Sequence, residues 1–339
     1  MKTTTKLLSA AAAIALPAAS AVQAQESSRL SWEMEIEIGV EHVLSSDDPT
    51  AEITDAFLSN EIVVSYEFSD TVTGVVEFTL ESVTDPTDDR AFEDLGLYVS
   101  ELNLVFDLGS AELTVGKISP AFGIAWDAAP GFFGANFAED YELGESLGAS
   151  LAFELGAGNL TLAAFYQDDT VLSRSIGTDR GRTRESDGGV GNTGTLNNFS
   201  IQYDFEVGNT EISASAMHLA AGVGDTDDQN GAALGFVHNF NDQVEVVGEV
   251  AYFDGFGGTT DNANYVTLGA SYFSGPFTYT ASVTRRDVSS SGTDYIASLG
   301  LDYTFDNDIT LSSGLVHVEE GGVNSTGLGL SVIIPLGNT

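Results

Sequence analysis

The chain has 339 residues, of which 51 are acidic and 11 are basic, so its formal net charge is −40. This charge argues against a nucleic-acid partner, because phosphate backbones are bound through Lys and Arg. The chain has no cysteine, which excludes disulfides and thiolate metal sites. Length alone allows one large domain or two ordinary ones.

The first 24 residues have the features of an export signal. Lys2 and Lys6 precede an apolar, alanine-rich run, and either Ala19-Ser20-Ala21 or Val22-Gln23-Ala24 after it suits signal peptidase. Such a segment is removed on export, so we expect a signal peptide at 1–24 and one domain at 25–339. No later segment has the ~18 uninterrupted apolar residues of a membrane helix. If this domain lies in a membrane, it spans that membrane with strands.

One phrase recurs along the rest of the chain. Alternating apolar residues lead to one or two aromatic residues, a short group of turn formers follows, and the alternation resumes, as in a β-hairpin with a tight turn. The seven copies are YEFSDTVTG at Tyr66, VFDLGSAEL at Val105, AFELGAGNL at Ala152, YDFEVGNTEI at Tyr203, HNFNDQVEV at His238, YFSGPFTYT at Tyr272 and YTFDNDITL at Tyr303. Seven hairpins supply fourteen strands, and alternation at 30–44 and 326–336 adds two more.

The pattern therefore predicts about sixteen strands. They are 30–44, 57–68, 71–82, 95–107, 111–118, 144–155, 159–167, 198–207, 210–219, 231–240, 244–253, 264–273, 277–286, 294–305, 308–318 and 326–336. Tight turns are expected at 69–70, 108–110, 156–158, 208–209, 241–243, 274–276 and 306–307, with longer polar loops at every other junction. Short turns on one side and long loops on the other are typical of a bacterial outer-membrane barrel. The expected fold is an all-β, transmembrane, antiparallel β-barrel.

The aromatic residues of the repeats lie on the apolar strand face, most of them just before a short turn. They are Tyr66, Phe68, Phe106, Phe153, Tyr203, Phe205, Phe236, Phe240, Tyr272, Tyr303 and Phe305. In a closed barrel they form a girdle at the periplasmic membrane surface. The alternative, a soluble exported β-sandwich, explains the alternation but not a girdle confined to the side of the tight turns.

The opposite strand face carries many carboxylates, which line the interior if the apolar face meets lipid. They are Glu33, Glu35, Glu37, Glu41, Glu61, Glu67, Glu77, Glu81, Glu101, Glu112, Glu154, Glu245, Glu249 and Asp302. So much unpaired charge cannot be buried in a dry core, and barrels of about 16 to 18 strands leave an aqueous channel. The pattern predicts a passive, water-filled pore whose acidic wall concentrates cations.

The connection Ile118–Ser146 is long and rich in aromatic residues. It contains Phe122, Trp126, Phe132, Phe133 and Phe137. An apolar loop of this length is expected to fold back into the barrel mouth, away from water. GKISPAFG at 116–123 is similar to the Gly-Arg/Lys and Pro-x-Phe-Gly elements around the constriction loop of Gram-negative general diffusion porins. WD at 126–127 and FAEDYE at 137–142 resemble porin-like proteins of alphaproteobacteria.

The resemblance implies a third external loop that bends inward and faces basic residues on the opposite wall, and three barrels that associate as a homotrimer. The residues that match the constriction loop are Trp126, Asp127, Glu139, Asp140, Glu142 and Glu145. Basic partners are scarce. The alternation places Arg286 on the lumen side of its strand, but it does not decide which face carries Lys117 or Arg285. The family's cluster of wall arginines is largely missing, which favours cation selectivity.

The connection 168–197 holds four arginines, Arg174, Arg180, Arg182 and Arg184. They either pair with the acidic lumen or with lipopolysaccharide phosphates, or they form a self-neutralising, solvated loop with Asp179, Glu185 and Asp187, which is the favoured interpretation. Acidic loops such as 225–228 suit weak Ca²⁺ binding. No cofactor is expected.

The expected protein is a channel in the Gram-negative outer membrane, not an enzyme. The four histidines, His42, His218, His238 and His317, lie on or beside different strands and form no catalytic set. The expected partners are membrane lipid, lipopolysaccharide, small hydrophilic solutes and cations. A substrate-selective channel of the sugar or siderophore type stays an alternative, because aromatic residues such as Trp126 suit a sugar path. A barrel plugged by its own loops is another.

Overall fold

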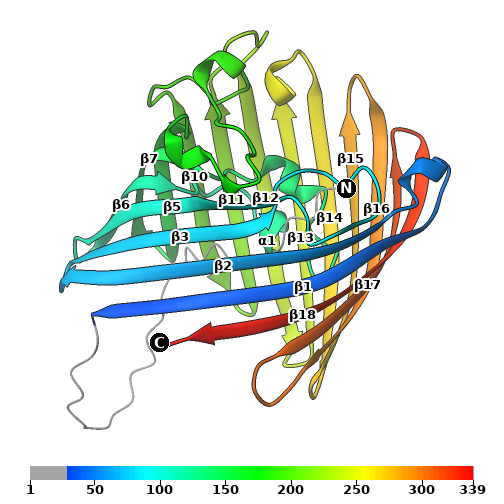
Figure 1. Ribbon diagram of the computed structural model, residues 1–339. Coiled ribbons are helices and arrows are strands. Elements are labelled where there is room, and N and C mark those ends of the chain that lie inside the picture. The colour runs from blue at the N-terminus through cyan, green and yellow to red at the C-terminus, as the bar shows by residue number, and fades with distance from the viewer. Residues whose placement is uncertain (1–28, 339) are drawn as a thin grey trace.

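Sixteen antiparallel strands form a closed wall (Figure 1). They are β1 (Leu30–Ser46), β2 (Thr54–Ser69), β3 (Val72–Ser82), β5 (Leu95–Asp107), β6 (Ala111–Ile118), β7 (Ser146–Leu155), β8 (Gly158–Gln167), β10 (Asn198–Val207), β11 (Thr210–Leu219), β12 (Gln229–Asn241), β13 (Val244–Asp254), β14 (Asn262–Ser274), β15 (Phe277–Val288), β16 (Gly292–Thr304), β17 (Thr310–Glu320) and β18 (Val323–Gly337). The computed structural model describes residues 29–338, so the expected signal peptide at 1–24 lies outside the described residues. The predicted strand number is confirmed.

The remaining elements are short and lie in the connections. Two strands, β4 (Arg90–Ala91) and β9 (Ile176–Gly177), have two residues each. The helices are η1 (Pro49–Ala51), α1 (Ala125–Ala128), η2 (Ala138–Tyr141), η3 (Val171–Ser173), η4 (Glu185–Asp187) and η5 (Phe256–Gly258). Within residues 29–338, no helix is long and apolar enough to cross a membrane.

The first and last wall strands close the barrel by pairing with each other (Figure 1). Their register runs from Glu33 opposite Gly337 to Ser46 opposite Ser325. At the end of the seam, the backbone N–H of Trp32 donates to Asn338 Oδ1 at 2.8 Å. Closure removes the unpaired edges that an open sheet would expose.

The two faces of the wall have opposite polarity, as the alternation predicted. On the outside, the side chain of Leu299 is 61% exposed, whereas its neighbour Ser298 is 5% exposed inside. Leu268 and Thr267 show the same contrast on β14. An apolar exterior around a polar interior is the reverse of a soluble protein and suits a lipid environment. The soluble-sandwich alternative is therefore wrong: the wall is one closed sheet.

Aromatic rings gather beside the short turns, where the repeats placed them. Tyr66 contacts Phe68 with ring centroids 5.1 Å apart, and Tyr303 contacts Phe305 at 4.8 Å. Phe277 joins the second pair at 5.0 Å from Tyr303. Because these rings stand on the outer face at strand ends, they have the placement of a membrane-surface girdle.

The loops at the other end of the barrel differ in part from the expected pattern. Long connections were expected near 287–293 and 319–325, but only 289–291 separates β15 from β16, and only two residues separate β17 from β18. These two are Gly321 and Gly322, with φ of 59° and 80°. Two consecutive residues with positive φ make the tight hairpin turn that glycine favours. The polar residues around this Gly-Gly pair extend the strands instead of forming a loop.

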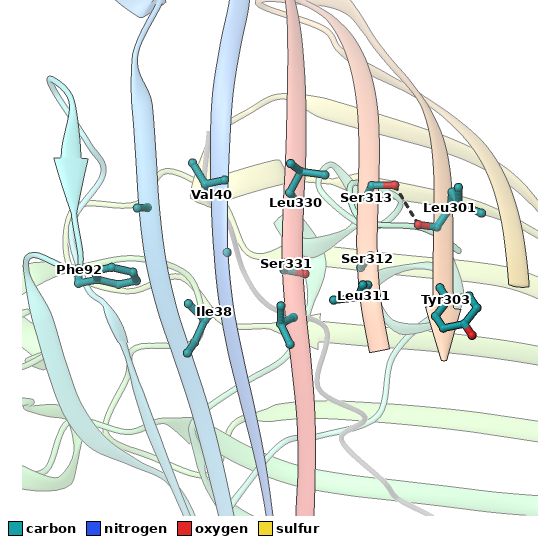
Figure 2. Close-up of a pocket in the computed structure, with 13 residues that line it drawn as sticks. Ile38, Val40, Phe92, Leu301, Tyr303, Leu311, Ser312, Ser313, Leu330 and Ser331 are labelled. Carbon is teal, nitrogen blue, oxygen red and sulfur yellow. Dashed lines mark hydrogen bonds between the residues drawn. The ribbon is translucent and has the colours of Figure 1, made fainter. Parts of the chain in front are cut away.

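Outward side chains at the seam line an apolar groove (Figure 2). Ile38 and Val40 of β1 lie between Leu330 of β18 and Phe92, which follows β4 (Figure 2). The N–H of Phe92 donates to the carbonyl of Ala56 at 2.7 Å, which holds its ring beside the barrel. The groove is thus formed jointly by the closing strands and the connection 83–94.

Leu299→Arg tests the orientation of the wall. A charge on the lipid face near mid-strand is expected to lower the free energy of unfolding by about 2–4 kcal/mol. The measurement is urea unfolding of the protein inserted in lipid vesicles. Leu299→Ala, which removes apolar area without adding charge, should cost clearly less. Equal costs for the two variants would contradict a lipid-facing position.

Candidate pore constriction

Carboxylates gather on the inner face of β1, β2, β3 and β5. Glu35 stands opposite Glu61 across β1 and β2, and Glu77 stands opposite Glu101 across β3 and β5. Glu61 interacts electrostatically with the other three and with Glu81. The predicted acidic wall residues are therefore brought together on one side of the barrel.

Two further predicted wall residues lie on the same face of β1. Glu37 is buried, whereas Glu33 is exposed near the start of the strand. Both alternate with outward apolar residues such as Ile36 and Ile38. We define the acidic wall as Glu33, Glu35, Glu37, Glu61, Glu77, Glu81 and Glu101.

The connection 119–145, here the third loop, is held by one buried carboxylate of β13. Glu249 accepts hydrogen bonds from the backbone N–H of Ile124 at 2.6 Å and of Ala125 at 3.2 Å. It also accepts from the Tyr141 hydroxyl at 2.6 Å, so it ties together two distant parts of the loop. These bonds satisfy N–H groups at the start of α1 that have no partner within the helix.

Glycines on the inner face allow the third loop to lie directly on the strands. A Cβ at Gly269 of β14 would be 2.2 Å from Cδ of Pro130, and one at Gly329 of β18 would be 2.3 Å from a ring carbon of Phe132. Gly235 and Gly314 are in similar contact with Ile124 and Phe132. Glycine is required at such close approaches because any side chain would displace the loop.

The aromatic residues of the third loop are packed into a hydrophobic cluster. Phe122 and Phe133 are completely buried, and Phe122 lies 5.7 Å from Phe253 of β13. Tyr141 contacts Tyr265 of β14 at 5.0 Å. The inner face next to the loop is therefore apolar, although sequence alternation predicted a polar lining throughout. Packing against inward apolar residues keeps the loop's aromatic side chains out of water.

Asp140, a predicted constriction residue, is held by the opposite strands. The Tyr265 hydroxyl donates to its Oδ2 at 2.8 Å, and Arg286 of β15 donates at 2.9 Å. Arg286 also binds Asp294 at 2.8 Å and Glu320 at 2.5 Å. The predicted basic partner on the lumen side thus binds three carboxylates at once. Its guanidinium also lies 4.4 Å from the centroid of the Phe137 ring.

Among the other predicted residues of the third loop, Glu142 interacts electrostatically with Asp127 and Glu145 and with the acidic wall. Burial within the barrel mouth, followed by repulsion from Asp127, Glu145, Glu77 and Glu81, raises the pKa of Glu142 to about 7. Its side chain is nevertheless exposed to solvent, so water and salt moderate both effects. Asp127 and Glu139 are half-buried. The indole N–H of Trp126 donates to the carbonyl of Phe122, so Trp126 stabilises the loop itself.

Sequence reasoning missed a charged network at the base of the third loop. The sequence did not decide which strand face carries Lys117. Its side chain is completely buried and binds Glu145 at 2.7 Å and Asp168 at 2.9 Å. Arg180 binds the same Glu145 at 2.5 Å. The expected self-neutralising loop is found for Arg174, which forms an exposed pair with Asp179 at 2.6 Å. For Arg180 the expectation was wrong, because its partner lies 35 residues earlier in the chain.

Two smaller expectations also concern charged groups. Arg285 lies on the outer face beside Asp287, at 2.7 Å. No group of three or more side chains suited to a metal ion occurs among residues 29–338. Weak Ca²⁺ binding by exposed acidic loops stays a prediction.

Comparison of structures shows that this architecture is that of a porin. An engineered variant of the Rh. blastica porin is 18% identical, with a TM-score of 0.61 over 91% of this chain and 100% of that chain. The outer membrane channel DcaP of Acinetobacter baumannii is 13% identical, with a TM-score of 0.65 over 91% of this chain and 97% of that chain. No protein-family model and no curated protein sequence matches the chain. The chain therefore has the porin fold, and the predicted resemblance is confirmed at the level of the fold.

Glu249→Ala tests the anchoring of the third loop. Loss of a buried carboxylate that accepts three hydrogen bonds should open the loop, and amide hydrogen exchange at Ile124 and Ala125 should become about 10- to 100-fold faster. Glu245→Ala is the matched control, because Glu245 lies on the same face of β13 but closer to the tight turn. Unchanged exchange in Glu249→Ala would show that packing alone holds the loop.

Proposed function

We propose that this chain forms a water-filled, cation-selective channel of the Gram-negative outer membrane, through which small hydrophilic solutes diffuse passively. The observation that carries the proposal is the approach of two acidic groups: the third loop brings Glu142 within electrostatic range of Glu77 and Glu81 of the acidic wall. Carboxylates on both sides of a passage attract cations and repel anions.

The third loop is the element that we assign to the narrowest part of the channel. Its contacts with Glu249, Arg286 and the inner-face glycines support this assignment. These contacts lie mainly on β12 to β18, whereas the acidic wall is carried by β1, β2, β3 and β5, where Glu101 accepts a hydrogen bond from the N–H of Ser119 at the start of the loop, at 3.1 Å. Ions that pass between the loop and the acidic wall meet Glu142 and Asp127 of the loop on one side.

The basic side chains near the channel are mostly neutralised, which supports cation selectivity. Arg286 binds three carboxylates, and Lys117 is buried between two. These two basic side chains therefore do not form a free cationic row opposite the acidic wall. An anion-selective channel would require such a row.

We also propose that three copies associate. We place the contact between copies at the seam groove of Figure 2, an apolar recess of the outer face that includes the ring of Phe92. Lipid and lipopolysaccharide would then cover the rest of the outer face.

Single-channel recording in a planar bilayer tests the channel function. The mature chain, refolded and inserted, should give open-channel current steps and a reversal potential in a KCl gradient of the sign that cation selectivity requires. Closure in groups of three equal steps would support the trimer. Steps that one sugar or siderophore blocks would favour a substrate-selective channel. Complete absence of steps would favour a plugged barrel and contradict the proposal.

The selectivity should also depend on pH through Glu142. Its raised pKa means that the carboxylate is charged above about pH 7 and neutral below it. Lowering the pH from about 8 to about 6 should therefore reduce the cation-to-anion permeability ratio, most clearly in dilute salt. Glu142→Gln should weaken this dependence, whereas Glu154→Gln, at an exposed position near a tight turn, should leave it unchanged. Equal pH profiles in wild type and Glu142→Gln would contradict this role.

A further inference from the structure

The wall has a gap where the third loop leaves it. Strand β6 ends at Ile118, and its pairing with β5 ends at Lys117 opposite Leu102. Strand β5 extends from Asp107 back to Leu95, so residues 95–101 have no partner in β6 on this edge. An unpaired strand edge at this position would leave backbone polar groups without partners.

The connection 168–197, here the fourth loop, fills part of this gap. Its strand β9 pairs with the free edge of β5, with Gly177 opposite Gly96 and Ile176 opposite Leu97. The N–H of Thr178 adds a hydrogen bond to the carbonyl of Leu95 at 2.8 Å. The fourth loop is therefore partly a wall element, and the residues that follow Thr178 begin at the edge of the lumen.

Arg180 turns from this edge towards the acidic wall. Its two terminal nitrogens donate to the two oxygens of Glu145 at 2.8 and 2.5 Å. Its guanidinium lies 3.5 Å from the ring centroid of Tyr98, whose hydroxyl donates to Glu81 of the acidic wall at 2.6 Å. A bidentate ion pair and ring stacking use the planar geometry that distinguishes Arg from Lys.

The partner of Arg180 is itself tightly held. Glu145 has a φ of 40°, in the left-handed region that is costly for a side chain other than glycine. Lys117 binds the carboxylate of Glu145, and the backbone carbonyl of Glu145 accepts a hydrogen bond from the N–H of Asp168 at 2.8 Å. The third and fourth loops thus meet at one strained residue that several contacts keep in place.

We propose that Arg180 is a selectivity-determining residue of the channel: it holds the fourth loop in the wall gap and places a tethered cation among the lumen carboxylates. This inference rests on the proposed channel function. Its side chain is 20% exposed, so its charge acts on passing ions and partly offsets the acidic wall next to Glu81. The arginine therefore limits the cation selectivity that the rest of the lumen produces.

Arg180→Gln should make the channel more cation-selective. In about 0.1 M KCl the cation-to-anion permeability ratio should rise about twofold, and the difference should shrink in about 1 M KCl, where the Debye length falls to about 3 Å. Arg174→Gln is the matched control, because it removes the same charge from an exposed pair in the same loop. An unchanged ratio in Arg180→Gln, or an equal rise in both variants, overturns the inference. A wild-type protein that does not conduct overturns the proposed function instead.

Two further variants separate the charge from the fold. Arg180→Lys keeps the charge but loses the bidentate pair, so its ratio should match the wild type while amides of 175–180 exchange faster. Unchanged amide exchange in Arg180→Lys would overturn the role of Arg180 in holding the fourth loop.

The chain has no cysteine, so Arg180→Cys offers a single thiol. Its modification with a cationic aminoethyl reagent should lower the ratio towards the wild-type value, and a neutral methyl reagent should not. Equal effects of the two reagents would overturn the role of the charge.

Discussion

The structure depends on closure of the sheet by hydrogen bonds between β1 and β18. In a hydrocarbon environment an unpaired backbone N–H or carbonyl costs several kcal/mol, and a closed barrel is the arrangement of strands that leaves none at an edge. Once the sheet is closed, the period of two in each strand separates its side chains into an outer and an inner set. Leu299 and Ser298 illustrate the result, since neighbouring residues lie in opposite environments. An inner set of mostly polar side chains follows from the same closure that allows an apolar exterior.

The inner face then has to accommodate the third loop, and its junction with the fourth, without burying unpaired charge. The aromatic residues of the third loop pack against an apolar part of the inner face, and two of its backbone N–H groups donate hydrogen bonds to Glu249. Inner-face glycines such as Gly269 provide the close approach that this packing requires. Lys117 can be completely buried because Glu145 and Asp168 compensate its charge. The loops are therefore built into the wall by complementary chemistry at each contact.

The proposed selectivity follows from an unequal distribution of charge inside the barrel. Carboxylates of the acidic wall outnumber the basic side chains near them, and burial followed by repulsion, in part from Glu77 and Glu81 of this wall, raises the pKa of Glu142 in the third loop. The basic side chains form ion pairs where the loops meet the wall: Arg286 binds Asp140, and Arg180 binds Glu145. Arg286 is neutralised by its three carboxylate partners, whereas the proposed role of Arg180 depends on a charge that stays partly exposed beside the acidic wall. Structure and proposed selectivity are two results of one set of contacts.

The sequence by itself determined the strand number, the two wall faces and the side of the aromatic rings, because these depend on local alternation and turn residues. It also identified Arg286 as a lumen residue, since its position in β15 follows from the same alternation. It misplaced two loops near the C-terminus, where Gly321 and Gly322 form a tight turn whose signal was present but was read as part of a loop. Only the tertiary structure decided the apolar part of the inner face and the pairing of Arg180 with Glu145. Those contacts join residues far apart in the chain, and their geometry exists only after the barrel has closed.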